Sequence, residues 1–244
     1  MKRFRMFAGP NGSGKSTFIK EIEKQCFIGF YINADDIERE LNENIDGLNC
    51  ENYYAGIVSQ PDWNAFIYNN STDLRYRNID VNQVKITSNI LTVNTSVNSY
   101  FAAVIAEFFR YLLLESDRSF SFETVMSHHS KVSFLKEAKD KGFKTYLYFI
   151  CTSDPEINKR RVKIRVSKGG HDVEEDKIEK RYYNSLGLLK DAFLAVDRAY
   201  ICDSSTENSN SIILFEKKGE EMKFHTEEVP EWILDYLVNR LQFD

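Results

Sequence analysis

The chain has 244 residues, with 32 Lys and Arg against 37 Asp and Glu, so its formal net charge is −5. Apolar residues make up 42% and charged residues 28% of the sequence, which is ordinary globular composition and excludes global disorder. The acidic balance argues against a general nucleic-acid binder, so we expect no nucleic-acid partner. The length corresponds to between one and two domains.

Membrane insertion and disulfide or zinc frameworks are not indicated either. The most apolar stretch, 102–114, is interrupted by Glu107 and Arg110 and is too short to span a bilayer. The basic N-terminus reaches Gly9 before any apolar run, so we expect no secretory signal. The four cysteines are scattered and form no C-x-x-C pair. Reduced thiols in a cytoplasmic protein are the simplest interpretation.

The first half of the chain alternates between short apolar runs and helical patterns. Apolar runs bounded by turn residues and apolar spacing of three or four predict, in chain order, a strand at 3–8, a helix at 16–26, a strand at 30–32 and a helix at 35–42. The stretch 43–97 is rich in Asn and weakly patterned, except for alternation at 84–87 and 90–93 that indicates a small hairpin. We interpret 43–97 as an insertion.

Regular patterning returns at residue 99. The same criteria predict helices at 99–115 and 131–141, strands at 119–122, 144–151 and 198–202, a hairpin within 212–224, and a terminal helix at 231–241. Asp154-Pro155 is a helix cap followed by proline, and Asp172 with Glu175 resembles a capping box for a helix toward Leu189. Strands and helices in alternation predict a parallel sheet covered on both faces.

The strongest motif is Gly9-Pro10-Asn11-Gly12-Ser13-Gly14-Lys15-Ser16-Thr17, which fits G-x-x-x-x-G-K-[ST]. Its glycines let the backbone curl so that several N–H groups point at phosphate oxygens. Lys15 adds a positive charge at the β- and γ-phosphates, and the Ser16 hydroxyl can ligate Mg²⁺. Because the motif follows a predicted strand and opens a predicted helix, we expect residues 9–17 to bind ATP with Mg²⁺.

The missing motifs narrow the class of NTPase. The sequence has no Leu-Ser-Gly-Gly-Gln-like segment of ABC transporters, no Asp-x-x-Gly with Asn-Lys-x-Asp of GTPases, and no hydrophobic-Asp-Glu after a strand. We therefore expect an α/β P-loop NTPase of the kinase type, with a parallel sheet of about five strands flanked by helices and an arginine lid. It would be one domain over 1–244, with the insertion at about 43–97 and a C-terminal hairpin and helix extension at about 205–244.

A kinase of this type needs an acceptor site and a base. Asp35 and Asp36 follow the second predicted strand, at the sheet edge where ligands bind in open α/β folds. A carboxylate there could deprotonate an acceptor hydroxyl, and we favour Asp35; the alternative is that both aspartates cap the next helix. Glu123 ends the third predicted strand and could hold a Mg²⁺-bound water or the acceptor; the alternative is a surface turn residue.

The kinase also needs a basic lid. Residues 159–168 contain six cations in ten positions and no acid, and Gly169-Gly170 follows as a flexible break. Arg161, Arg165 and Lys168 fall on one helical face, where arginines could stabilise charge on the transferred phosphoryl group. The alternative is a solvated basic face. His128-His129 has no third ligand and is interpreted as a polar turn.

Four blocks together resemble the zeta-toxin family of P-loop kinases. They are 8–17, Ile32-Asn33-Ala34-Asp35-Asp36-Ile37, Phe120-Ser121-Phe122-Glu123-Thr124, and Arg165 through Gly169-Gly170-His171-Asp172-Val173. The resemblance spans roughly residues 3–203. It implies an ATP- and Mg²⁺-dependent kinase, and zeta toxins phosphorylate a sugar hydroxyl of UDP-N-acetylglucosamine. It also implies an antitoxin protein as a partner.

The resemblance assigns roles by matching blocks. Lys15 and Ser16 would bind ATP and Mg²⁺, Asp35 would be the base, Arg161 or Arg165 would act from the lid, and the acceptor would be bound by Glu123, Thr124 and Arg181. Two other functions stay open: a nucleotide-binding regulatory or interaction module with weak ATPase activity, and a metabolic nucleotide kinase. The 43–97 stretch is longer than in compact family members, so the acceptor is not fixed by the resemblance.

Overall fold

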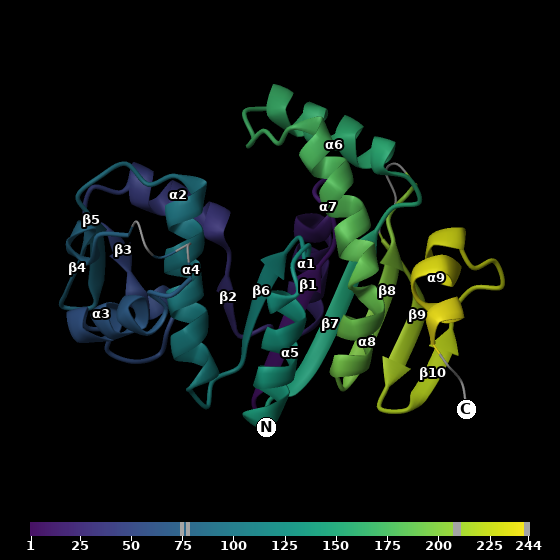
Figure 1. Ribbon diagram of the computed structural model, residues 1–244, viewed down its shortest axis with the longest axis horizontal. Coiled ribbons are helices and arrows are strands. Elements are labelled where there is room, and N and C mark those ends of the chain that lie inside the picture. Colours follow the sequence, from purple (N-terminus) through teal and green to yellow (C-terminus); the bar gives the residue numbers. More distant parts are fainter. Residues whose placement is uncertain (74–75, 77–78, 207–210, 242–244) are drawn as a thin grey trace. The chain divides into compact units, whose positions relative to one another are not determined.

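The structure is a computed structural model that describes residues 1–73, 76, 79–206 and 211–241. The chain divides into two compact units, one formed by Met1–Ile28 with Ser121–Asp244 and the other by Gly29–Phe120 (Figure 1). Within the described residues, no helix has both the length and the apolar character needed to cross a bilayer.

A mostly parallel sheet forms the centre of the first unit. Its strands are β1 (Arg3–Ala8), β6 (Phe120–Thr124), β7 (Lys144–Cys151), β8 (Arg198–Asp203), β9 (Ile212–Lys218) and β10 (Glu221–Phe224). Among the described residues of this unit they follow the order β10-β9-β8-β7-β1-β6. Strands β1, β7 and β8 pair in parallel, whereas β9 and β10 extend the sheet as an antiparallel hairpin. The predicted α/β sheet and the predicted hairpin within 212–224 are both confirmed.

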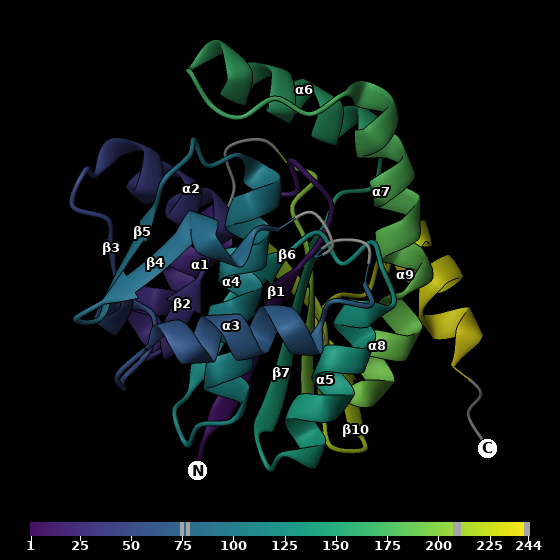
Figure 2. The ribbon, with the colours of Figure 1, turned by 60° about the vertical axis from the view of Figure 1, so that its left-hand side comes forward.

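Helices cover both faces of this sheet. They are α1 (Lys15–Gln25), α5 (Ser130–Asp140), α6 (Pro155–Ser167), α7 (Glu175–Gly187), α8 (Leu189–Ala195), α9 (Glu231–Tyr236) and the 3-10 turn η3 (Val238–Arg240). Ring contacts place α5, α8 and α9 on one face, through the pairs Phe4–Phe134, Phe193–Phe215 and Phe149–Trp232. On the other face Phe18 of α1 packs on Tyr148. Helix α6 lies beyond the carboxyl ends of β7 and β8 (Figures 1 and 2).

The second unit is built around an aromatic core. Its elements are β2 (Phe30–Ile32), α2 (Ala34–Glu43), β3 (Leu48–Asn49), η1 (Cys50–Asn52), α3 (Gln60–Asn69), η2 (Val81–Gln83), β4 (Val84–Thr87), β5 (Ile90–Val93) and α4 (Ser99–Leu114). Trp63 of α3 packs edge-on against Phe108 of α4. The predicted 84–93 hairpin is confirmed, and Ser88 and Asn89 at its turn have φ of 51° and 65°. Positive φ at both central residues gives the twist that a two-residue hairpin requires.

Two predicted helix boundaries differ from the structure. Asp154 caps α6 as expected, accepting a hydrogen bond from the Glu156 N–H at 2.8 Å. The capping box at Asp172 and Glu175 is wrong, because α7 begins only at Glu175 and Asp172 Oδ1 instead accepts from the adjacent Val173 N–H. The chain also breaks after Gly187, so the predicted helix continues as a separate α8.

The cysteines behave as buried or partly buried apolar residues. All four are free thiols, as their spacing predicts. Burial raises the pKa of the Cys50 and Cys151 thiols to about 12. Because the thiolate is the reactive species, we expect these two buried thiols to react slowly and to serve as packing groups.

Candidate nucleotide-binding site

Residues 9–17 form a curled loop between β1 and α1, and we call this segment the P-loop. Gly9, Gly12 and Gly14 have φ of 145°, 75° and 87°, a range that favours glycine. The Gly9 N–H donates to the Thr124 carbonyl at 3.2 Å, which ties the loop to the end of β6. The strand, loop and helix order is therefore the setting in which this motif holds phosphates.

The cationic and hydroxyl side chains of the P-loop meet one carboxylate. Lys15 is 6% exposed, and its Nζ donates to the Pro10 carbonyl at 2.9 Å. The same Nζ lies 3.7 Å from Glu123 Oε1, and the Ser16 hydroxyl donates to Glu123 Oε2 at 3.1 Å. The structure thus brings together three of the residues singled out from the sequence, and Glu123 balances the Lys15 charge.

The Ser16 and Glu123 oxygens fit a magnesium ion. Mg²⁺ prefers hard oxygen ligands and usually takes one or two from protein, with the rest from water and substrate phosphates. A hydroxyl and a carboxylate within hydrogen-bond distance match that donor set. Among the described residues there is no group of three or more His, Cys, Asp or Glu that could hold a metal ion.

The two arginines predicted for the lid make different contacts. Arg161 Nη2 donates to the Ser204 carbonyl at 2.6 Å, and the Ser204 hydroxyl donates to the Ser13 carbonyl of the P-loop at 2.6 Å. Arg161 is therefore linked to the P-loop by hydrogen bonds through one intervening residue, Ser204. Arg165 instead donates to the His171 carbonyl at 2.7 Å, which closes the turn between α6 and α7.

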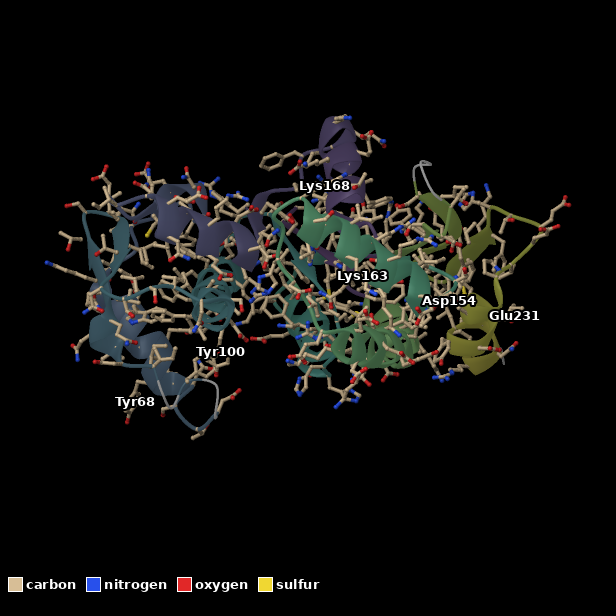
Figure 3. The ribbon with its side chains drawn as sticks, turned by 90° about the horizontal axis from the view of Figure 1, so that it is seen from above. Tyr68, Tyr100, Asp154, Lys163, Lys168 and Glu231 are labelled. Carbon is tan, nitrogen blue, oxygen red and sulfur yellow. The ribbon has the colours of Figure 1, made fainter. Side chains whose placement is uncertain are left out.

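Helices α6 and α7 are joined by ion pairs from the same basic run. Lys159 Nζ contacts Glu179 Oε2 and Lys163 Nζ contacts Glu175 Oε1, each at 2.6 Å. The hydrogen bond to Glu175 raises the pKa of Lys163, and its counterpart lowers the pKa of Glu175. Figure 3 shows α6 from Asp154 at its start, past Lys163, to Lys168 at its end. Part of the basic run thus holds the helix pair together.

Two further contacts reach the P-loop from α6 and α7. Arg181 Nη1 lies 3.4 Å from Asn11 Oδ1, so this residue, expected to bind the acceptor, also contacts the P-loop. Asn158 Nδ2 donates to the Asn11 carbonyl at 2.6 Å. Sequence reasoning missed Asn158, which falls one helical turn before Arg161, because nothing in its own neighbourhood marks a buried amide.

The candidate base belongs to the unit formed by 29–120. There the Asn33 side chain caps α2 by accepting from the Asp35 N–H at 2.9 Å. Asp36 Oδ1 is paired with Arg39 at 2.7 Å. The exposed Asp35 carboxylate makes no hydrogen bond or ion pair with the residues that the structure describes. The side chain that caps α2 is therefore Asn33.

Thr124 and His128, both singled out from the sequence, contact residues next to them in the chain. Thr124 Oγ1 accepts from the Met126 N–H at 3.2 Å, next to the carbonyl that receives Gly9. His128 Nδ1 lies 3.0 Å from the Ser130 hydroxyl in an exposed turn. These side chains shape the loop that follows β6, the strand that carries Glu123.

Comparison with known proteins supports the fold. No family model matches the chain. An uncharacterised protein of Haemophilus influenzae is 40% identical over 63 residues, which are 26% of this chain and 45% of that protein. The AvrRxo1-ORF1:AvrRxo1-ORF2 structure with sulphate ions has a TM-score of 0.59 at 13% identity, over 100% of this chain and 66% of that chain. A structure from the PezAT chromosomal toxin–antitoxin system of Streptococcus pneumoniae has a TM-score of 0.50 at 14% identity, over 99% and 80%. The chain therefore shares its α/β fold with the AvrRxo1-ORF1:AvrRxo1-ORF2 and PezAT structures.

This chain corresponds to only part of the proteins that it matches. The AvrRxo1-ORF1:-ORF2 structure with ATP has a TM-score of 0.57 at 12% identity, over 100% of this chain and 66% of that chain. The chain thus spans slightly less than two thirds of the AvrRxo1 chain and under half of the Haemophilus protein. At these identities the shared property is the fold alone.

Proposed function

We propose that the protein is an ATP-dependent phosphotransferase that moves the γ-phosphate to a hydroxyl of a small acceptor. The observation that carries the proposal is the meeting of Lys15, Ser16 and Glu123 at the P-loop. A buried ammonium, a hydroxyl and a carboxylate on a glycine-rich loop are the groups that hold a nucleotide triphosphate and its cation.

Each side chain has a defined task in this proposal. Lys15 binds the β- and γ-phosphates, which displace the carboxylate from its ammonium group. Ser16 and Glu123 hold Mg²⁺, which neutralises charge on the phosphate oxygens when bound. Asp35 accepts the proton of the acceptor hydroxyl, because its carboxylate is not used by the α2 cap. Arg161 would contact phosphate in this proposal, which its hydrogen bond to the Ser204 carbonyl beside the P-loop supports.

The acceptor and the partners are the finer part of the proposal. We propose UDP-N-acetylglucosamine as the first acceptor to test, with Glu123, Thr124 and Arg181 as its contacts, on the resemblance of the sequence blocks to zeta toxins. The AvrRxo1 and PezAT structures come from a two-protein complex and a toxin–antitoxin system. An antitoxin-like protein partner in the cytoplasm is therefore proposed for this chain as well.

Transfer of label from γ-³²P-ATP tests the proposal directly. The purified protein is incubated with Mg²⁺ and a panel containing UDP-N-acetylglucosamine, other UDP-sugars and nucleoside monophosphates. Label in a UDP-sugar supports the proposal, and label in a monophosphate identifies a metabolic nucleotide kinase instead. Binding of ATP without transfer to any acceptor contradicts the kinase assignment and favours a regulatory module.

Substitution of Asp35 tests the role of the base. We expect Asp35→Asn to lower turnover about 10²- to 10⁴-fold while ATP affinity is kept, because only the proton acceptor is removed. The matched control is Asp36→Asn, which loses the ion pair with Arg39. Equal losses in both variants, or full activity of Asp35→Asn, would show that Asp35 is not the base.

A further inference from the structure

Asn158 is a buried amide whose two ends are both engaged. It lies in the second turn of α6 and is 0% exposed. Its Nδ2 donates to the Asn11 carbonyl at 2.6 Å, and its Oδ1 accepts from the Thr152 hydroxyl. Since a carbonyl oxygen can only accept, the amide nitrogen must face Asn11, and the orientation of the side chain follows from its partners.

These contacts belong to a closed ring that joins both lid helices to the P-loop. The Tyr182 hydroxyl of α7 donates to the Thr152 carbonyl at 2.7 Å. Arg181, the preceding residue on α7, contacts Asn11 Oδ1 at 3.4 Å. The ring therefore runs from Thr152 through Asn158 and Asn11 to Arg181 and Tyr182. Burial raises the pKa of Tyr182, so its hydroxyl keeps the proton that this ring needs.

The position of the Asn11 carbonyl fixes the direction of the next N–H. In a trans peptide the C=O and the following N–H point to opposite sides. No peptide bond in the chain is cis among the described residues. Because the Asn11 carbonyl points at Asn158, the Gly12 N–H points away from α6. A Cβ at Gly12 would stand 2.6 Å from the Asn158 carbonyl oxygen, so this segment packs directly on the helix.

We propose that Asn158 is a positioning residue that aims the Gly12 N–H at bound phosphate and couples the P-loop to α6 and α7. The inference rests on the proposed function, because it takes residues 9–17 as the phosphate site. Asn158 contacts neither phosphate nor the reacting atoms. It acts by holding the peptide plane between Asn11 and Gly12. The ring through Thr152, Tyr182 and Arg181 connects that plane to α7 and to α6, the helix that carries Arg161.

Binding of inorganic pyrophosphate in the presence of Mg²⁺ measures this effect without any acceptor. We expect Asn158→Leu, which is similar in size and has no amide, to weaken pyrophosphate binding about tenfold in calorimetry. Asn184→Leu is the matched control, because Asn184 is an exposed residue of α7. It should bind as the parent does. Asn11→Ala keeps the backbone contact and loses only the Arg181 contact, so it should lose less than Asn158→Leu.

The same measurements separate positioning from a merely structural role. If Asn158→Leu lowers the thermal midpoint but binds pyrophosphate within twofold of the parent, the proposal is wrong. If Asn158→Leu does not fold, Thr152→Val removes the hydroxyl that donates to Asn158 Oδ1, together with its 3.2 Å contact to the Asp154 carbonyl, and should weaken pyrophosphate binding about threefold; parental affinity there overturns the proposal. A parent that binds pyrophosphate but transfers no phosphate rejects the kinase and leaves this result intact. A parent that binds neither ATP nor pyrophosphate overturns both.

Discussion

Replacing Glu123 with Gln should change the magnesium dependence of ATP binding. The Glu123 carboxylate stands 3.7 Å from the Lys15 ammonium. Coulomb attraction at that separation is about 1 kcal/mol in water and about 4.5 kcal/mol at an effective dielectric constant of about 20, before desolvation is subtracted. An incoming polyanion must compete with this carboxylate for Lys15. The substitution removes that competition but keeps the size of the side chain.

Two opposite effects follow from the same change. We expect Mg²⁺-free ATP to bind Glu123→Gln about five- to tenfold more tightly, which corresponds to about 1–1.4 kcal/mol. In saturating Mg²⁺ we expect weaker binding, because a neutral amide is a poorer Mg²⁺ ligand than a carboxylate. Calorimetric titration of ATP with EDTA and with Mg²⁺ gives both affinities. Glu21→Gln, in the same helix as Ser16 and paired with Lys24, is the control and should change neither.

The result that would refute this reasoning is an unchanged ratio between the ATP affinities measured with and without Mg²⁺. If the affinities with and without Mg²⁺ differ by the same factor in the parent and in Glu123→Gln, the carboxylate neither competes with phosphate nor holds the cation. A parent whose ATP affinity does not respond to Mg²⁺ at all would refute the assignment of Ser16 and Glu123 as magnesium ligands.

The remaining predictions concern stability, measured by urea unfolding. Gly12→Ala should cost about 2–4 kcal/mol, because its φ is +75° and its Cβ would stand 2.6 Å from the Asn158 carbonyl oxygen. Lys217→Met should cost about 2–4 kcal/mol, because Nζ donates at 2.8, 3.3 and 3.0 Å to three carbonyls at the end of α8. Burial raises the pKa of Asp197, but hydrogen bonds from Thr145 outweigh it and leave the pKa below its usual range. The charged carboxylate therefore stabilises the fold fully above about pH 4, and this stabilisation is lost as the pH falls through the lowered pKa. In Asp197→Asn the free energy of unfolding should fall less steeply with decreasing pH in this range.

The glycine and lysine variants each have a matched control. Gly142 has φ of +81° but open space around its Cα, so Gly142→Ala should lose only the backbone preference of about 1 kcal/mol. Lys218 is exposed, and Lys218→Met should change stability little. If Gly12→Ala costs no more than Gly142→Ala, the close approach to α6 is absent in solution. If Asp197→Asn leaves the acid profile unchanged, its hydrogen bonds do not stabilise the charged form.

Local sequence signals predicted the loop at residues 9–17 and the elements on either side of it. The glycine pattern, the strand before it and the helix after it specify the P-loop by backbone rules alone. The nearness of Glu123 also followed from a general rule, since carboxyl ends of neighbouring strands meet at one sheet edge. The role of Asp35 as the base stays a prediction. The alternative that the aspartates cap α2 is wrong, because the capping side chain is Asn33.

What sequence reasoning missed depends on contacts between distant segments. Helical spacing put Arg161 and Arg165 on one face, but one reaches Ser204 and the other the His171 carbonyl. Asn158 becomes informative only when α6 packs on the P-loop. The capping box failed because Asp172 bonds to its neighbour rather than to a helical N–H. Local propensity cannot report such choices, since the partners lie elsewhere in the chain or in competing turns.

The ion pairs between α6 and α7 bear on how these two helices, which we propose as the lid, can move. With Lys159 joined to Glu179 and Lys163 to Glu175, separating the two helices breaks both pairs, while swinging them as one body breaks neither. Bending is then confined to the junctions where the helix pair meets the sheet, near residues 152–154 and 187–188. High salt would screen the two ion pairs between α6 and α7 and leave those junctions unaffected. We therefore expect ionic strength to change the stiffness of the helix pair without changing the bending at its junctions.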